Sequence, residues 1–429
     1  MDILAVIGLI IVSAYLGSKV VQWIGIPQVV GFIIVGLLLG TSFLNIVPLE
    51  LVRELDFISE IALGLIGFEI GSHLRFGELR RMGRMILLIL LGEAVGTFLL
   101  VTTGVYLVTR SDYTALIFGA LAAATAPAAT VDVLAEYRSK GPLTTALLAV
   151  VGMDDVLALL LFSLAAAVAE SLLAQTGGLS LQEVLAFPLQ EIGGALALGI
   201  GIGLPFQWLL DRLKGRHAVY AYIVGTVLLV AGLANSIHAS LILATMSMGM
   251  VVTNVGSDNS QYVACVVERV GPLAYTLFFA LVGARFQVTL LPQMGLLGLL
   301  YLVLRSAGKF GGAWLGGWVG GAPPPVRDNL GLGLLSQAGV AVGLALSVAH
   351  RFDAYGEAGV RLGYTVVNVI TATTFVVQLL GPPMVKLAIT RAGEAGLGTA
   401  AEEEGIVPSV PCPEIERRSG ARVQGSDGA

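Results

Sequence analysis

Long apolar stretches recur along this chain, from its first residues almost to Ile389, with charged or Pro- and Gly-rich breaks between them. A helix needs about 20 predominantly apolar residues to cross the hydrocarbon core of a bilayer. Backbone polar groups in lipid must be satisfied internally, which favours helices that span the membrane. Only 12% of the residues are charged, where an average soluble protein has about 25%. The sequence therefore predicts an all-α polytopic membrane protein.

The breaks between the apolar stretches divide the chain into about 13 transmembrane helices. Their approximate limits are 3–22, 28–46, 52–72, 84–108, 114–135, 143–169, 185–210, 218–234, 237–254, 270–290, 294–319, 329–350 and 362–388. The first helix has no basic segment before it, so we interpret it as retained and not as a signal peptide. Residues 1–391 are predicted to form the transmembrane domain, and the polar residues 392–429 a disordered cytoplasmic tail.

Basic residues are distributed unequally between alternate loops, which predicts the orientation because cytoplasmic loops carry an excess of Lys and Arg. One set holds Lys19, Arg75, Arg80, Arg81, Arg84, Arg138, Lys140, Arg212, Lys214, Arg216, Arg269 and Arg327, and the other holds Arg53, Arg110, Arg285, Arg351 and Arg361. We therefore expect a multi-pass protein of the cell inner (plasma) membrane, with the N-terminus outside and the C-terminus in the cytoplasm. The net charge of −5 argues against a nucleic-acid partner, and we expect no cofactor.

Two adjacent acids, Asp154 and Asp155, lie in the middle of the apolar run 143–169. An ionised Asp at the centre of a membrane helix costs roughly 2.5–3.5 kcal/mol on insertion scales. Such a pair is expected only where it faces water, shares protons or binds a cation, so it predicts a functional site. Successive helical residues are about 100° apart. One acid should therefore pair with a basic residue while the other faces a cavity.

Two basic residues, Arg305 and Lys309, are buried in the eleventh predicted helix. Their i,i+4 spacing places both on one face, and Lys309 is the natural counter-charge for one acid of the pair. A buried Asp–Lys pair could also simply hold helices together. Glu69 is interpreted as a structural partner of Arg305 or as a residue at a helix end. Glu93 could fill the same role, and the sequence does not decide between them.

Two of the predicted helices contain sequences that interrupt a helix. The fifth has Pro127 at mid-depth, which removes a backbone donor and clashes with the preceding turn. The twelfth is rich in glycine over residues 331–340 and has polar side chains at similar depth. Carbonyls freed at such breaks must meet a neighbour, water or an ion. Interrupted helices in corresponding places of two halves are typical of inverted-repeat transporters.

Polar side chains at these breaks are candidates for a supporting ion site, namely Thr125, Thr130, Ser336 and Gln337. Each threonine could instead bond back to a carbonyl of its own helix. Asp132 follows the first break and is interpreted as an access residue or a solvated helix end, in preference to a ligand.

Several of these motifs resemble those of the monovalent cation:proton antiporter superfamily, in its NhaA/NapA-like branch with an Asp-Asp pair. The motifs are Gly25-Ile26-Pro27-Gln28-Val29-Val30-Gly31, Ile66-Gly67-Phe68-Glu69-Ile70-Gly71, the break at Thr125–Pro127, Gly152-Met153-Asp154-Asp155, Gly308-Lys309 and Leu335-Ser336-Gln337-Ala338-Gly339. The tandem acids with a later lysine are the specific part. One departure is Ala126, where many relatives carry an acid. The resemblance implies an NhaA-like fold, in which inverted repeats place two broken crossing helices together.

The resemblance also implies a role for each site residue. Asp155 would bind Na⁺ together with Thr125 and freed carbonyls, and Asp154 would be the partner of Lys309. Gln337 would lie in the second broken helix, the symmetry mate of the first. Neighbouring carboxylates titrate as a coupled unit, so the site could exchange two protons for one cation. The expected function is electrogenic Na⁺(Li⁺)/H⁺ antiport by alternating access, in a homodimer surrounded by membrane lipid.

Two alternatives remain open at this point. Exchange of K⁺ for H⁺ is the alternative closer to the expected function, because the types of side chain at the site do not reveal the radius of the cation that binds. An intramembrane aspartyl protease would belong to another class of protein. That chemistry needs two aspartates on different helices, whereas these are adjacent on one helix.

Overall fold

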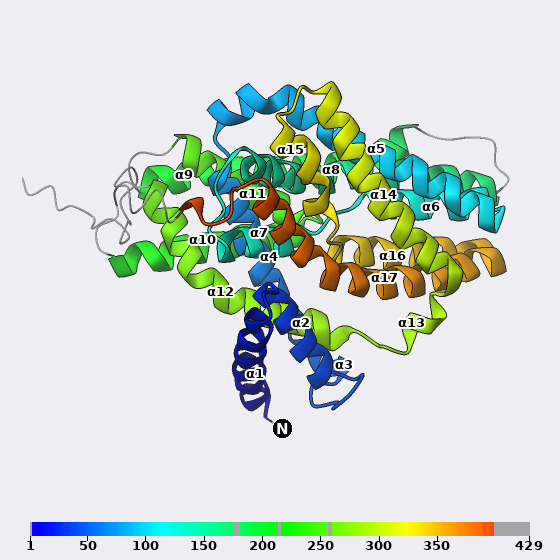
Figure 1. Ribbon diagram of the computed structural model, residues 1–429, viewed down its shortest axis with the longest axis horizontal. Coiled ribbons are helices and arrows are strands. Elements are labelled where there is room, and N and C mark those ends of the chain that lie inside the picture. The colour runs from blue at the N-terminus through cyan, green and yellow to red at the C-terminus, as the bar shows by residue number, and fades with distance from the viewer. Residues whose placement is uncertain (1, 175–180, 211, 213–215, 256–259, 399–429) are drawn as a thin grey trace, which may run out of the picture.

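The computed structural model describes residues 2–174, 181–210, 212, 216–255 and 260–398, and every regular element in these ranges is helical (Figure 1). In chain order the elements are α1 (Ile3–Trp23), α2 (Gln28–Leu39), α3 (Leu49–Glu54), α4 (Asp56–His73), α5 (Phe76–Thr109), α6 (Asp112–Ala123), α7 (Pro127–Glu136), α8 (Pro142–Ala174), α9 (Leu181–Leu210), α10 (Arg216–Ser236), α11 (Leu241–Val255), α12 (Ser260–Arg285), α13 (Leu290–Gln293), α14 (Gly295–Val319), α15 (Pro324–Asn329), η1 (Leu330–Leu334), α16 (Gly339–Phe352), η2 (Asp353–Tyr355) and α17 (Gly356–Arg391). The predicted all-α class is confirmed.

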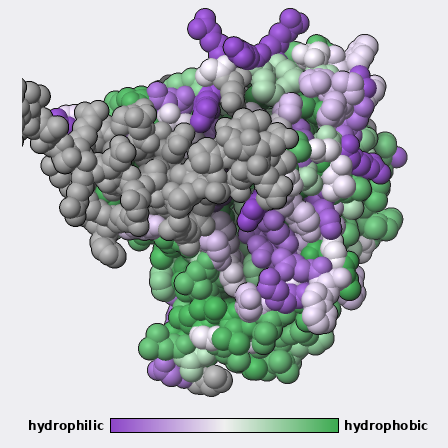
Figure 2. Space-filling view, turned by 60° about the vertical axis from the view of Figure 1, so that its left-hand side comes forward, coloured by the Kyte–Doolittle hydropathy of each residue, from purple (hydrophilic) through white to green (hydrophobic). Residues whose placement is uncertain are grey.

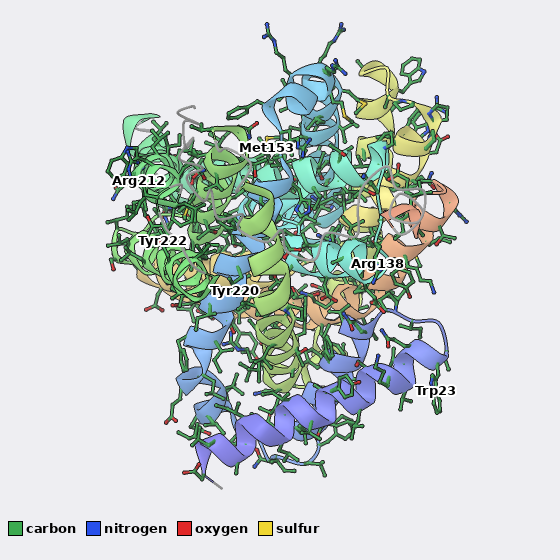
Figure 3. The ribbon with its side chains drawn as sticks, turned by 90° about the vertical axis from the view of Figure 1, so that its left-hand side faces the viewer. Trp23, Arg138, Met153, Arg212, Tyr220 and Tyr222 are labelled. Carbon is green, nitrogen blue, oxygen red and sulfur yellow. The ribbon has the colours of Figure 1, made fainter. Side chains whose placement is uncertain are left out.

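Helix length and composition identify the membrane-spanning part. Within the described residues, seven helices are long and apolar enough to cross a membrane, and three shorter helices are also apolar. The count of 13 crossings stays a prediction. The surface agrees with a lipid environment, because apolar side chains gather over the lower part of the molecule in Figure 2. Trp23 projects outward from the end of α1 and is 89% exposed (Figure 3).

The helices pack as two groups. In one group α5 packs along α14, α6 against α8, and α16 against α17. In the other α1 packs against α2, α2 against α12, α4 against α11 and α11 against α9. In Figure 1, α1, α2 and α3 lie together at the lower edge, and α16 and α17 lie side by side. The Asp-Asp pair of α8 thus belongs to the group that contains both broken helices.

Glycines allow the backbones of paired helices to touch, as is common in membrane helix packing. A Cβ atom added at Gly71 of α4 would overlap the carbonyl oxygen of Met246 in α11. In the same way, a Cβ atom at Gly36 of α2 would overlap the carbonyl oxygen of Ala280 in α12. Neither carbonyl is free to move, because it belongs to a helix backbone.

We expect Gly71→Ala to lower the midpoint of thermal unfolding of the purified protein by several degrees, because overpacking costs about 1–3 kcal/mol. Gly8→Ala in α1 is the matched control, since a Cβ atom there meets no atom within 4 Å. In that variant the helix propensity of alanine should leave stability unchanged or slightly higher. Equal midpoints for Gly71→Ala and the wild type would contradict the close contact.

Residues 392–398, which we assigned to the tail from the sequence, pack against the loop before α8. Glu394 is buried, and its carboxylate accepts hydrogen bonds from the backbone N–H groups of Leu143 (2.6 Å) and Thr144 (2.7 Å). It thereby satisfies N–H groups in the first turn of α8, which have no partner within the helix. The rest of the predicted tail, residues 399–429, lies outside the described residues.

Candidate ion-binding site

The two helix breaks meet in the middle of the molecule. The first lies between α6 and α7, where Ala124 and Ala126 have extended backbones. Pro127 opens α7 at a position whose N–H would have no helical partner in any case. The second lies between η1 and α16. The N–H of Ala126 donates to the carbonyl oxygen of Ser336 at 3.0 Å, so one backbone hydrogen bond joins the breaks. The predicted pair of interrupted helices is confirmed.

Lys309 of α14 is fully buried beside the first break. Its Nζ donates to Glu93 Oε2 at 2.6 Å, to Thr125 Oγ1 at 2.8 Å and to Asp154 Oδ2 at 3.0 Å. It also contacts the carbonyl oxygen of Ala123, the last residue of α6. An ammonium group has three donors, so these four acceptors satisfy it completely. Two carboxylates therefore share one positive charge out of contact with solvent.

Arg305 lies one helical turn before the lysine and is also fully buried. Its guanidinium donates to the carbonyl oxygens of Leu335 (2.6 Å), Ala124 (2.8 Å) and Ser336 (3.3 Å). These carbonyls are left free where the two helices break. A positive charge there offsets the negative end of a helix dipole, and the arginine holds both breaks at one place.

The two acids considered as partners of Arg305 have other partners in the structure. Glu69 was interpreted as a partner of Arg305 or as a residue at a helix end, and its Oε2 accepts a hydrogen bond from the Tyr275 hydroxyl at 2.5 Å. Glu93 was the alternative partner, and it pairs with Lys309 instead. Within the described chain, Arg305 donates to backbone carbonyls and to the hydroxyl of Tyr301. The carbonyl oxygens at the broken helix ends thus compensate the positive charge of Arg305, a role that we expected an acidic side chain to fill.

Asp155 is not among the residues that accept a hydrogen bond from Lys309. It is 7% exposed, and its Oδ1 has no hydrogen-bond partner in the part of the chain that the structure describes. It lines a cavity of about 440 Å³ between α8, α9 and α16. Asp154, in contrast, is fully buried against Lys309. The two acids have separate surroundings, as their angular separation on α8 requires.

The predicted supporting residues hold the breaks together. Thr130 Oγ1 donates to the carbonyl oxygen of Gly333 at 3.1 Å, across to η1 and not back to its own helix. Gln337 Nε2 donates to the carbonyl oxygen of Leu121 at 2.8 Å. The hydroxyl of Ser336 is buried and has no hydrogen-bond partner among the described residues. That any of these side chains touches an ion stays a prediction.

Asp132 lies on α7, beyond the break. It is 6% exposed and interacts with the side chain of Gln28 in α2. The alternative of a solvated helix end is therefore wrong, whereas a role in access stays a prediction. One turn later, Glu136 accepts hydrogen bonds from Gln22 Nε2 at 2.8 Å and from the Gln28 backbone N–H at 2.9 Å. This end of α7 is thereby fastened to the other group of helices.

Glu93 is the site residue whose partner the sequence did not indicate. It is the single charged residue in the run 85–109, which already marked it as unusual for a membrane helix. Its partner could not be predicted, because the rotation of α5 about its axis decides whether it faces Arg305 or Lys309.

Comparison with known proteins decides the class. A family model described as "Sodium/hydrogen exchanger, transmembrane" matches residues 8–387. The chain belongs to this family. It is therefore a transporter of the monovalent cation:proton antiporter superfamily and not an enzyme, which removes the intramembrane protease from consideration.

Individual relatives are more distant. The chain is 24% identical over 317 residues to the ammonium/H⁺ antiporter subunit AmhT of Alkalihalophilus pseudofirmus, covering 72% of this chain and 78% of that protein. Two structures of the sodium/proton antiporter MjNhaP1 from Methanocaldococcus jannaschii are 20% identical to it. Each match covers 93% of this chain and 98% of MjNhaP1, with TM-scores of 0.66 for the structure at pH 8 and 0.72 for an electron-microscopy structure. At this identity the likeness supports a shared fold.

Proposed function

We propose that this exchanger exports Na⁺ or Li⁺ in return for protons, that each cycle moves net charge, and that Asp155 binds the cation. One observation carries the proposal. Of the two adjacent acids, Asp154 forms an ion pair with Lys309, whereas Asp155 forms no ion pair among the described residues and lines the cavity. A buried carboxylate without a partner is costly, and binding either a proton or a monovalent cation removes that cost.

Charge balance at the site favours one bound cation. When ionised, the carboxylates of Glu93, Asp154 and Asp155 outweigh the cations Arg305 and Lys309 by one negative charge. A single Na⁺ restores neutrality, and so does a single proton. The two ligands therefore compete for Asp155, and the arriving cation releases its proton.

The second proton is assigned to the cluster around Lys309. When the helix group around the breaks moves, the shared contact of Lys309 with Asp154 and Glu93 opens and closes. A proton leaves the ammonium or enters a carboxylate of this cluster as that happens. Two protons moving inward against one cation moving outward transfer one net positive charge inward. The membrane potential then drives cation export.

Alternating access fits the arrangement of the two helix groups. The cavity opens from Asp155 toward the ends of α8 and α16 that carry Glu170 and Arg351. At the opposite end Glu136 joins α7 to α2 through a hydrogen bond with the Gln28 backbone N–H. In the orientation predicted from the loops, the open side is the outside of an inner membrane. We infer that α1 and α12, which expose Leu16 and Leu273, contribute to a homodimer in lipid.

Exchange of K⁺ for H⁺ is the second candidate. The relative from Alkalihalophilus pseudofirmus is named for ammonium, an ion of about the size of K⁺. The same carboxylate and carbonyl oxygens could hold such an ion if the site were wider. The choice between the two candidates thus depends on how closely the oxygens approach the ion.

Proteoliposomes that contain a pH-sensitive dye would test both candidates. We expect Na⁺ and Li⁺ to dissipate an imposed pH gradient, and the rate to change with an imposed membrane potential. Protein-free liposomes given the same ions are the control. A response to K⁺ and ammonium without a response to Na⁺ would select the second candidate. A rate that does not depend on the potential would reject electrogenic exchange.

A further inference from the structure

The cavity that ends at Asp155 contains a second carboxylate, which belongs to the other group of helices. Glu191 of α9 is half-buried in the cavity wall, and its charge interacts with that of Asp155. Because α9 packs on α11 and Asp155 lies on α8, the two acids approach from opposite sides of the boundary between the helix groups. Both carboxylates line the one cavity through which a cation would reach Asp155.

Within the described ranges, Glu191 has no structural partner that would account for its position. Among the described residues, its carboxylate takes part in no hydrogen bond and no ion pair, although other members of the cavity wall do. The cationic side chain in the wall, Arg351, is occupied by Glu170, to which its guanidinium donates with two nitrogens. Glu170 thereby offsets a charge that would repel cations. The remaining field in the cavity is negative.

The deep end of the same cavity independently indicates a cationic ligand. Asp155 is nine-tenths buried there with an oxygen that nothing in the described chain satisfies. Hydroxyl groups of Ser240 and Ser347 also line the wall and can replace water around an ion. Apart from the paired Arg351, the cavity wall consists of oxygen atoms that can coordinate a cation and of apolar surface. This lining suits a small hard cation that keeps part of its hydration shell.

We infer that Glu191 is a transient binding residue for the transported monovalent cation, which it holds at the cavity side before the ion enters, or after it leaves, the site at Asp155. The inference rests on the proposed function and names a further residue on the route of the ion. A cleft with low-dielectric walls and one sign of charge raises the local concentration of the opposite ion. Glu191 therefore raises the apparent affinity for the cation, whereas the exchange of cation for proton takes place at Asp155.

The test measures exchange against Na⁺ concentration in right-side-out and inside-out membrane vesicles. For Glu191→Gln we expect the half-saturating Na⁺ concentration to rise on the order of tenfold in the vesicle type that offers Na⁺ to the cavity. The half-saturating Na⁺ concentration in the other vesicle type should stay close to that of the wild type, and so should the maximal rate in both vesicle types. Glu191→Asp, which retains the charge, should restore most of the affinity.

Glu357→Gln is the matched control, because Glu357 is an exposed acid in the first turn of α17 and does not line the cavity. An unchanged half-saturating concentration in Glu191→Gln would overturn the inference. So would an equal rise in both vesicle types, or the same rise in Glu357→Gln. Failure of the proposed function would look different, because the wild-type protein would then show no Na⁺-dependent proton movement at all.

Discussion

Asp155→Asn should abolish cation-dependent proton movement, reducing the rate at least about a hundredfold, to the level of protein-free liposomes. Asparagine has nearly the same shape, so the α8 backbone and the cavity wall remain in place. It carries no negative charge and releases no proton, and the competition between cation and proton at this position disappears. Proteoliposomes with a pH-sensitive dye would measure the loss on addition of Na⁺ or Li⁺.

The control for this prediction is Asp112→Asn. Asp112 is an exposed acid in the first turn of α6, remote from the lysine cluster. This variant loses one carboxylate charge as well, and it should exchange at nearly the wild-type rate. Thermal unfolding of both variants would show that they fold. Exchange that persists in Asp155→Asn would remove Asp155 from the ion site and leave the cavity without an assigned role.

Lys309→Gln should have the second-largest effect, on both charge movement and stability. The surviving exchange should depend little on an imposed membrane potential, because without the ammonium the cluster no longer gains and loses the second proton. Stability should fall, since Glu93 and Asp154 lose the positive charge that they share. Breaking a buried ion pair by removing one partner costs on the order of 3–5 kcal/mol. Rates at imposed potentials and thermal unfolding would measure the two effects separately.

A double-mutant cycle with Glu93→Gln separates the two roles of the lysine. The single variant Glu93→Gln keeps the contact between Lys309 and Asp154, and we expect it to retain potential-dependent exchange. Adding Glu93→Gln to Lys309→Gln removes one of the two uncompensated carboxylates and should recover part of the lost stability. The coupling between these neighbours is the difference from additivity. Unchanged potential dependence in Lys309→Gln would reject the lysine as a proton carrier.

The sequence by itself determined the features that depend on interactions between neighbouring residues: the helical class, the helix break at Pro127 and the separation of the two acids. The apolar runs could satisfy their backbone only as helices in lipid, so the class followed from composition and run length. Pro127 could not continue a helix, and its presence in an apolar run was enough to predict a break. The separation of Asp154 from Asp155 followed from the helical angle between neighbours. Because of this angle, one acid was expected to pair with a basic residue and the other to face a cavity.

Only the tertiary structure decided which charges meet. The contact of Glu93 with Lys309 joins residues 216 positions apart, and it depends on the rotation of α5 and α14 about their axes. A small rotation would have turned Glu93 toward Arg305, with no change in hydropathy. The backbone carbonyls that hold Arg305 exist as acceptors only because two helices break at the same depth. Glu191 likewise belongs to the cavity only because of how α9 packs, since a helix sequence does not record which neighbour each face will meet.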